Sequence, residues 1–196
     1  MKVVILNTGS SNLLSVQHSV ERLGYSVEIS DDMHKISCAE KIIFPGIGTI
    51  SAVMDRLYFM NLVNIIREIT QPLLGICLGM QVLGLHSEES GGVKSLGIVP
   101  DIVSLIDSKG LVLPHVGWNS IDIISENPLF KNITIKDRFY FLHSYAMPIN
   151  KYTISSTLYG VNFSSSIQYN NFFGVQFHPE KSGLSGQTVL KNFLKI

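Results

Sequence analysis

The first half of the chain alternates between short apolar runs and amphipathic segments. Val3–Leu6 is an unbroken run of β-branched and aliphatic residues, which is typical of a strand covered on both faces of a sheet. After turn residues at 7–11, aliphatic residues recur every three or four positions between Leu13 and Leu23, which predicts a helix that ends at Gly24. Further strands are expected at Ser26–Ile29, Ile42–Phe44 and Leu73–Ile76, and further helices at Leu57–Ile69 and Leu78–His86. This alternation predicts βαβ units and a parallel sheet.

The second half of the chain has a different pattern. Between Gly91 and Val175, short β-type runs are separated by Gly, Pro, Asn and Ser residues. The runs are Ile98–Ile106, Ser120–Ile124, Phe139–His143, Thr153–Thr157 and Gly174–Phe177, and a last helix is expected at Gly186–Leu194. We interpret the runs as antiparallel additions and as the remaining strands of the central sheet. No repeat or linker is visible, so we expect one α/β domain over residues 1–196, with a mostly parallel sheet and helices on both faces.

Composition and charge narrow the classes of function. Lys and Arg together number 15, as do Asp and Glu, so the formal net charge is zero. A sequence-independent nucleic-acid binder needs a basic excess, and no such excess exists here. Charged residues make up 15% of the chain, against about 25% in typical soluble domains. The surface is therefore expected to be lightly charged, which fits a subunit that covers part of itself with a partner.

The same features predict a cytoplasmic protein without a membrane partner. No apolar run approaches the ~18–20 residues that a membrane helix needs, and the first apolar stretch is too short for a secretory signal. Two cysteines, Cys38 and Cys77, make no disulfide framework. His18, His34 and His86 have no partner at ligand spacing, so neither a metal nor a cofactor is expected.

The first candidate for chemistry is the segment Gly75–Gly79, which follows a predicted strand and precedes a predicted helix. A nucleophile on a sharp strand-to-helix turn needs small residues two positions before and after it, because its backbone is crowded. Cys77 occupies that position, and a helix N-terminus favours its thiolate. The backbone N–H of Leu78 would then face an oxyanion. The alternative is a buried, inert cysteine between two packing glycines.

The second candidate is the segment Phe173–Glu180, which we interpret as a strand that ends in His-x-Glu. Side chains two positions apart share one face of a strand, so Glu180 can orient His178 toward a nucleophile. The alternative is an exposed strand end. Parallel sheets gather the carboxyl ends of their strands at one edge, so Cys77 and His178 make sense as one site. The segment Pro45–Gly48 follows another strand, and its glycines allow a backbone N–H to turn toward an oxyanion.

Five motifs in this order resemble those of the class I glutamine amidotransferases. They are PGIGT at 45–49, GICLGMQ at 75–81, HVGWN at 115–119, FLHSYA at 141–146 and GVQFHPEKSG at 174–183. Within that family, PHVGWN and HSYA are similar to the glutaminase subunits of imidazole glycerol phosphate synthase, from histidine biosynthesis. The resemblance spans the whole chain and implies a flavodoxin-like α/β domain. Asn7 stands where the family more usually has Asp, so this position keeps a hydrogen-bond acceptor but lacks the charge for an ion pair.

The resemblance implies a role for each matching residue. Cys77 would attack the γ-amide of glutamine, His178 would transfer the proton and Glu180 would orient the imidazole, with a thioester intermediate resolved by water. Leu78 and either Ile47 or Gly48 would donate to the oxyanion. The residues expected to bind glutamine are Gly46, Gln81, Glu89, His143, Ser144 and Tyr145. Glu88 stands beside Glu89 and is an alternative to it.

The resemblance also implies a partner. Ammonia released into water at pH 7 would become ammonium, which is not a nucleophile, so the site should abut another subunit, one that takes the ammonia through a dry passage. In the family that partner is a (β/α)8-barrel cyclase, which makes imidazole glycerol phosphate and an aminoimidazole carboxamide ribotide. Asn12, Trp118, Asn119 and Lys181 would lie at or near this contact. The alternative for Trp118 is a core aromatic, and the alternative for Lys181 is a solvated charge.

Three other functions compete with this one. The first is the glutaminase of a different synthase, which co-purification with a barrel cyclase would decide. The second is a binding subunit without activity, which is expected to lack Cys77 or His178, and both are present. The third, a peptidase or esterase on a similar scaffold, fits less well, because HSYA and Gln81 suit a free amino acid.

Overall fold

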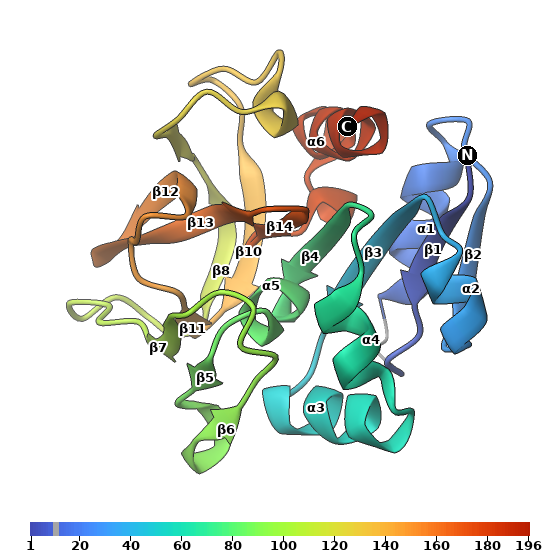
Figure 1. Cartoon of the computed structure of the whole chain (residues 1–196). Coiled ribbons are helices and arrows are strands. Elements are labelled where there is room, and N and C mark those ends of the chain that lie inside the picture. The colour runs from blue at the N-terminus through green and yellow to red at the C-terminus, as the bar shows by residue number, and fades with distance from the viewer. Residues whose placement is uncertain (10–11) are drawn as a thin grey trace.

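The computed structural model describes residues 1–9 and 12–196, so two residues of the predicted 7–11 turn lie outside it (Figure 1). Its largest sheet has eight strands in the order β2-β1-β3-β4-β14-β13-β12-β9. The first five are parallel: β2 (Val27–Ser30), β1 (Val3–Leu6), β3 (Lys41–Gly46), β4 (Leu73–Cys77) and β14 (Phe172–Val175). The last three are antiparallel: β13 (Val161–Tyr169), β12 (Thr153–Tyr159) and β9 (Asp122–Ile123). The expected parallel sheet with antiparallel additions is confirmed.

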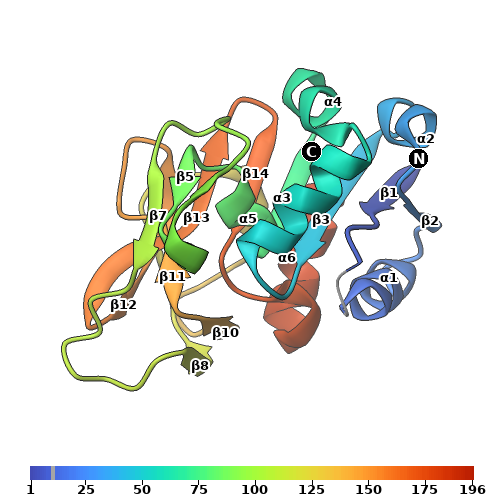
Figure 2. The same ribbon diagram turned by 90° about the horizontal axis from the view of Figure 1, so that it is seen from below.

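Helices cover both faces of the parallel part (Figure 2). On one face lie α1 (Leu13–Glu21) and α6 (Gly183–Lys195); on the other lie α2 (Met33–Ser37), α3 (Ile50–Phe59) and α4 (Leu62–Glu68). Successive side chains of a strand point to opposite faces. Val3 and Ile5 of β1 therefore pack in the core under α1 and α6, and Val4 and Leu6 in the core under the other three. The short helix α5 (Leu78–Val82) follows β4 directly.

Two smaller sheets flank the antiparallel end. One has the order β11-β7-β5-β6, and the other pairs β10 with β8. Their strands are β5 (His86–Ser87), β6 (Val93–Lys94), β7 (Ile102–Leu105), β8 (His115–Asn119), β10 (Phe139–His143) and β11 (Tyr145–Ala146). The described residues also include the 3-10 turns η1 (Glu89–Gly91), η2 (Pro128–Phe130) and η3 (Pro179–Lys181).

The helix predicted at Leu57–Ile69 is wrong. The structure has two helices there, α3 and α4, because Asn61 adopts a left-handed conformation (φ 55°) that no α-helix can continue through. The helix predicted at Leu78–His86 stops at Val82, and the chain then turns into β5.

Strand β13 was not among the predicted strands, because its centre is a run of three serines that reads as polar. Ser164, Ser165 and Ser166 are fully buried, and their hydroxyls bond to Thr153 and Ser155 of β12. A buried hydroxyl is tolerated where it has a hydrogen-bond partner. The neighbouring strand satisfies these serines, which a search for apolar runs does not detect.

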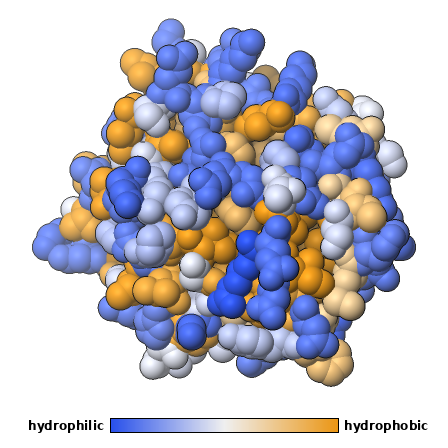
Figure 3. Space-filling model, viewed as in Figure 1, coloured by the Kyte–Doolittle hydropathy of each residue, from blue (hydrophilic) through white to orange (hydrophobic). Residues whose placement is uncertain are grey.

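The surface carries many apolar side chains between polar ones. On the face in Figure 3, apolar residues gather below the centre, around a group of strongly polar ones. The large exposed hydrophobic side chains of the protein include Phe59, Val112, Trp118, Ile135 and Leu184. Over residues 1–9 and 12–196, none of the helices combines the length and the apolar character needed to span a bilayer.

Candidate active site

Cys77 stands at a sharp turn between β4 and α5. Its backbone has φ 53° and ψ −108°, values that a non-glycine residue rarely adopts. This conformation is strained, and strained residues cluster at functional sites. The side chain is 7% exposed and lines a pocket of about 230 Å3. The backbone makes the sharp strand-to-helix turn that the sequence predicts at this position.

The glycines on either side of Cys77 make this turn possible. A Cβ atom on Gly75 would approach the carbonyl oxygen of Gly79 to 2.6 Å. A Cβ atom on Gly79 would come within 1.8 Å of the carbonyl oxygen of Phe44 in β3. Both contacts are with backbone atoms, which cannot move aside easily. The spacing Gly-x-Cys-x-Gly therefore reflects a close approach between α5 and the sheet.

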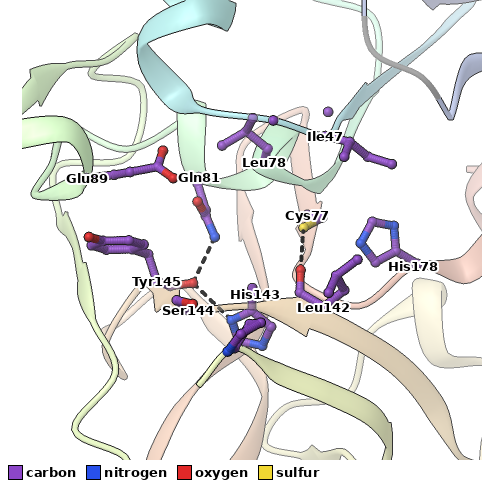
Figure 4. Close-up of a pocket in the computed structure, with 13 residues that line it drawn as sticks. Ile47, Cys77, Leu78, Gln81, Glu89, Leu142, His143, Ser144, Tyr145 and His178 are labelled. Carbon is purple, nitrogen blue, oxygen red and sulfur yellow. Dashed lines mark hydrogen bonds between the residues drawn. The ribbon is translucent and has the colours of Figure 1, made fainter. Parts of the chain in front are cut away.

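His178 and Glu180 form a buried pair beside Cys77. Nδ1 of His178 lies 2.9 Å from Oε1 of Glu180, and the side chains are 1% and 0% exposed. Nδ2 of Asn12 donates to the same oxygen at 3.0 Å. Nε2 of His178 is buried and has no hydrogen-bond partner among the described residues. In Figure 4 the His178 ring and the Cys77 sulfur lie next to each other at one end of the pocket.

The pKa of His178 is raised strongly. Burial by itself lowers the pKa of this imidazole, but the negative charge of the Cys77 thiolate and the hydrogen bond to Glu180 outweigh it and raise the pKa to about 10. Burial also acts to raise the pKa of Glu180, yet His178 and Asn12 hold that pKa below its usual range. At neutral pH the pair is therefore an imidazolium and a carboxylate.

The local structure around His178 differs from the prediction. We expected His178 and Glu180 on one face of a strand, but β14 ends at Val175 and Glu180 lies in the 3-10 turn η3. Pro179 is the first residue of this turn, a position where its fixed φ is favourable and its missing N–H costs nothing. The predicted contact is present, but a tight turn makes it rather than the alternation of a strand.

The pocket brings together most of the residues predicted to act on substrate. Besides Cys77 and His178, its walls include Gly46, Ile47, Gly48, Leu78, Gln81, Glu89, His143, Ser144 and Tyr145. Gly46 is the last residue of β3 and pairs with Cys77, the last residue of β4. The oxyanion candidates Ile47 and Gly48 come next in the chain, so they lie near the end of β4 as well. Gly48 has φ 115°, a conformation that favours glycine. The three candidate oxyanion donors thus line the same pocket as Cys77, just beyond the ends of the neighbouring strands β3 and β4.

The two neighbouring glutamates point to different places. Glu89 lines the pocket, and its Oε2 accepts a hydrogen bond from the N–H of Ile50 at 2.7 Å. Oε2 of Glu88 instead accepts from the N–H of Leu105 at 3.3 Å, outside the residues that line the pocket. The geometry favours Glu89 over Glu88 as a ligand-binding side chain.

A second buried histidine lines the pocket in a neutral setting. Nδ1 of His143 lies 2.9 Å from the carbonyl oxygen of Tyr145, and its Nε2 lies 3.2 Å from Nδ1 of His115. Burial lowers the pKa of His143 to about 3 and that of His115 to about 4. Both imidazoles are therefore uncharged at neutral pH. His115 also stacks between Phe141 and Tyr159.

The residues predicted at the contact with a partner separate into two groups. Trp118 is 58% exposed, its ring meets that of Tyr140 edge-on, and Nζ of Lys181 lies 5.8 Å from the Tyr140 ring centre. Asn119 is half-buried, and its amide reaches His115 and the carbonyl of Leu158. Asn12, in contrast, is 3% exposed and holds Glu180.

Two contacts of the site were absent from the sequence-based interpretation. Asn12 was expected only at the partner contact, and Gln176 had no role although it belongs to one of the quoted motifs. Nε2 of Gln176 donates to Sγ of Cys77 at 3.5 Å, and its side chain is fully buried. A glutamine within an apolar strand run is a signal that could have identified it, because a buried amide needs partners.

The site offers nucleophile, acid and polar ligand-binding groups but no metal cage. In the part of the chain that the structure describes, three or more His, Cys, Asp or Glu side chains do not gather as metal ligands. A cysteine activated by a charged histidine, beside backbone N–H groups, is suited to acyl transfer from an amide or ester.

Comparison with known proteins agrees with this chemistry. The profile of the family "Glutamine amidotransferase class-I" matches residues 4–196. The imidazole glycerol phosphate synthase subunit HisH of Buchnera aphidicola subsp. Schizaphis graminum is 52% identical over 197 residues, and that of Buchnera aphidicola subsp. Acyrthosiphon pisum is 53% identical over 196, each with full coverage of both chains. A crystal structure of a glutamine amidotransferase from Thermotoga maritima has a TM-score of 0.71 at 13% identity, covering 100% of this chain and 96% of that one. This chain therefore belongs to the class I glutamine amidotransferase family.

Proposed function

We propose that the chain is the glutaminase subunit of an imidazole glycerol phosphate synthase, in histidine biosynthesis. It hydrolyses glutamine to glutamate and ammonia with Cys77, His178 and Glu180 as its catalytic residues. The observation that carries the proposal is the buried His178–Glu180 pair, which shares one pocket with a cysteine on a strained turn. Full-length relatives at about 50% identity support the assignment to this synthase.

The first half of the reaction forms a thioester. The Cys77 thiolate attacks the γ-carbonyl carbon of glutamine, and the carbonyl electrons move to oxygen, where Leu78 N–H and an N–H of Ile47 or Gly48 stabilise the charge. When the intermediate collapses, the carbon–nitrogen bond breaks and nitrogen takes a proton from His178. A pKa of about 10 means that this proton is already on the imidazole at rest. His178 thus begins the cycle as a general acid.

The second half releases glutamate. His178, now neutral, takes a proton from water as that water attacks the thioester carbon. The carbon–sulfur bond breaks and its electrons return to sulfur, which restores the thiolate and the imidazolium. Glu180 stays ionised throughout and stabilises the imidazolium, as the orienting carboxylate of a triad does. Glu89 binds the α-ammonium of glutamine in this proposal, and its other polar groups are bound by Gly46, Gln81, His143, Ser144 and Tyr145; that all six residues line the pocket supports this assignment.

The product ammonia calls for a partner next to this pocket, and we propose that it is a (β/α)8-barrel cyclase. In the β8–β10 pair, Val116 lies opposite Leu142 and Trp118 opposite Tyr140. This face is exposed or half-buried along its length, whereas His115, Phe141 and His143 on the other face are buried. Leu142 also lines the pocket. An apolar surface therefore runs from the pocket toward Trp118 and Lys181, and Asn119 lies in β8 beside Trp118.

Two further expectations stay predictions. They are the role of Asn12 at the interface with the partner and the cytoplasmic location of the protein.

The proposal is tested by glutamate release with a partner present. The purified chain is mixed with a barrel cyclase of such a synthase, with and without the nucleotide substrate of the cyclase. We expect slow release by the chain alone and faster release when the cyclase and its nucleotide are present. Cys77→Ala should abolish release, while synthesis from added ammonium salt persists. Cys38→Ala is the matched control, because Cys38 is exposed and outside the pocket, and it should behave as the unaltered protein does.

Two outcomes would contradict the proposal. If Cys77→Ala also stopped synthesis from ammonium, the residue would not act in glutamine hydrolysis alone. If glutamate release never responded to a barrel cyclase but responded to another kind of synthase, the chain would be the glutaminase of that synthase.

A further inference from the structure

Cys77 contacts the side-chain amide of Gln176 in addition to lying beside the His178–Glu180 pair. Its Sγ lies 3.7 Å from the carbonyl oxygen of Leu142 and 3.5 Å from Nε2 of Gln176. Gln176 lies just beyond the end of β14 and is fully buried. Its other amide atom, Oε1, accepts a hydrogen bond from Nε2 of Gln81 at 3.0 Å. The sulfur therefore has an N–H donor on the side of the sheet, independent of His178.

The direction of these hydrogen bonds is determined by a backbone carbonyl. Nε2 of Gln81 also donates to the carbonyl oxygen of Tyr145 at 2.8 Å (Figure 4). A carbonyl oxygen only accepts, so Gln81 must turn its NH2 group toward Tyr145. That NH2 group also meets Gln176, which must therefore present its oxygen to Gln81 and its own NH2 group to Cys77. The amide next to the sulfur is thus oriented as a donor, and its flipped orientation is excluded.

The Tyr145 carbonyl is itself held from the opposite side. Nδ1 of His143 donates to it, so Nε2 of His143 must accept from Nδ1 of His115. Nε2 of His115 then accepts from Nδ2 of Asn119 at 3.4 Å. This assignment requires both imidazoles to be neutral, and burial lowers the pKa of each well below 7. One consistent set of donors and acceptors thus extends from Asn119 to the sulfur.

We propose that Gln176 is a positioning residue that holds the Cys77 sulfur as a thiolate, and that the hydrogen-bonded chain through Gln81 and Tyr145 fixes its N–H toward the sulfur. This inference rests on the proposed role of Cys77 as the nucleophile. An N–H donor stabilises the charged form of a thiol, whereas an apolar contact does not. A buried amide beside the sulfur also supplies this donor without adding a group that titrates.

Several titratable groups face Cys77 and bear on any test by pH. His178 lies just beyond the end of β14, and His143, Tyr145 and Glu89 line the same pocket from β10, β11 and η1. His143 stays neutral above about pH 5, because burial lowers its pKa to about 3. The charge of Cys77 is among the causes that raise the pKa of His178, so these two groups titrate as a pair and the midpoint of alkylation belongs to the pair. His143 does not change its charge between pH 5 and 9, so a difference in midpoint between two variants reports on the Cys77–His178 pair and its N–H donor.

The test is the pH dependence of alkylation of Cys77 by iodoacetamide in the full chain, followed by mass spectrometry of each cysteine. Gln176→Met keeps the length and approximate volume of the side chain but removes the N–H donor. We expect the midpoint of the Cys77 profile to rise by about one pH unit, which corresponds to the loss of one hydrogen bond to a charged group. Cys38 is an internal reference, because it is exposed and its profile should not change.

Two further variants separate this role from a structural one. Gln187→Met in α6 is the matched control, half-buried and outside the pocket, and both cysteine profiles should stay unchanged. If Gln176→Met does not fold, Gln81→Met decides, since it releases Gln176 from its orientation and should shift Cys77 in the same direction. An unchanged Cys77 midpoint in the folded variant would overturn the proposal. Because alkylation needs no glutamine turnover, this result is distinct from a failure of the proposed glutaminase activity.

Discussion

Two histidines of the pocket make the same local contact and end in opposite charge states. In each case Nδ1 lies 2.9 Å from an oxygen of the residue two positions further along the chain. For His178 this oxygen is the carboxylate Oε1 of Glu180, and for His143 it is the backbone carbonyl oxygen of Tyr145. Both side chains are buried. Yet the pKa of His178 is raised to about 10, whereas that of His143 is lowered to about 3.

The difference lies in the charge of the neighbours. Burial lowers the pKa of both imidazoles, because a low-dielectric surrounding disfavours the charged form. Tyr145 offers His143 a neutral carbonyl, which does not overcome this effect. Glu180 and the Cys77 thiolate offer His178 two negative charges, which do. One histidine is thus prepared to carry a proton, and the other to hold a fixed hydrogen-bond pattern.

The largest expected effect comes from removing His178 and Glu180, the charged pair of this comparison, one at a time. His178→Asn removes the acid and base, and Glu180→Gln leaves the imidazole but takes away its carboxylate. We expect the loss of glutaminase kcat to be about 10- to 100-fold smaller for Glu180→Gln, since an orienting group generally contributes less than the base. Steady-state glutamate release with the partner present measures both. Equal losses would argue against the assigned roles.

The neutral histidines, His143 and His115, are tested by the pH dependence of the free energy of unfolding. Unfolded His143 and His115 take up protons near pH 6.5, while the folded ones resist protonation until about pH 3 and about pH 4. Between pH 6.5 and 4 the unfolded state therefore binds more protons, and stability falls as the pH falls. His143→Gln should reduce this slope by about 1.4 kcal/mol for each pH unit, measured by urea unfolding. An unchanged slope would mean that His143 titrates normally in the folded protein.

The charged His178 affects stability in the opposite direction, because stability falls as the pH rises. His178 gains a raised pKa on folding, so its contribution to stability is complete below pH 6.5 and is lost as the pH approaches about 10. His143→Gln leaves the His178–Glu180 pair in place and should not alter this alkaline limb. An unchanged alkaline limb in the His143→Gln variant is therefore the control for the change expected in its acid limb.

The smallest expected effect concerns the support of Glu180. Asn12→Ala removes the donor that reaches Oε1 of Glu180 at 3.0 Å, which should raise the pKa of that carboxyl and weaken its hold on His178. We expect a three- to tenfold loss of glutaminase activity, about 1 kcal/mol, in line with a hydrogen bond to a charged group felt indirectly. Asn7→Ala is the control, since Asn7 bonds only to the nearby Gly9 N–H among the described side-chain contacts. Equal losses for the two variants would contradict the role of Asn12.

Local patterns in the sequence predicted the strands that the site depends on. Val3–Leu6 and Phe139–His143 are strands with the predicted bounds, because an apolar run reports directly on burial. Gly75 and Gly79 marked the turn at Cys77, because a backbone approach that excludes a Cβ atom requires glycine at those positions. The joint between α3 and α4 left no such mark, since an asparagine in a left-handed conformation looks like any other polar residue of a helix.

The amino-acid sequence by itself determined which apolar runs become buried strands, that the backbone turns sharply at Cys77, and which family the chain resembles. The tertiary structure alone decided which polar groups meet: Asn12 with Glu180 across 168 positions, and Gln81 with Gln176 across 95. It also decided that one buried histidine is charged and the other neutral. Periodicity records how a segment faces its surroundings, but the partner and charge of a buried polar group depend on packing between distant segments.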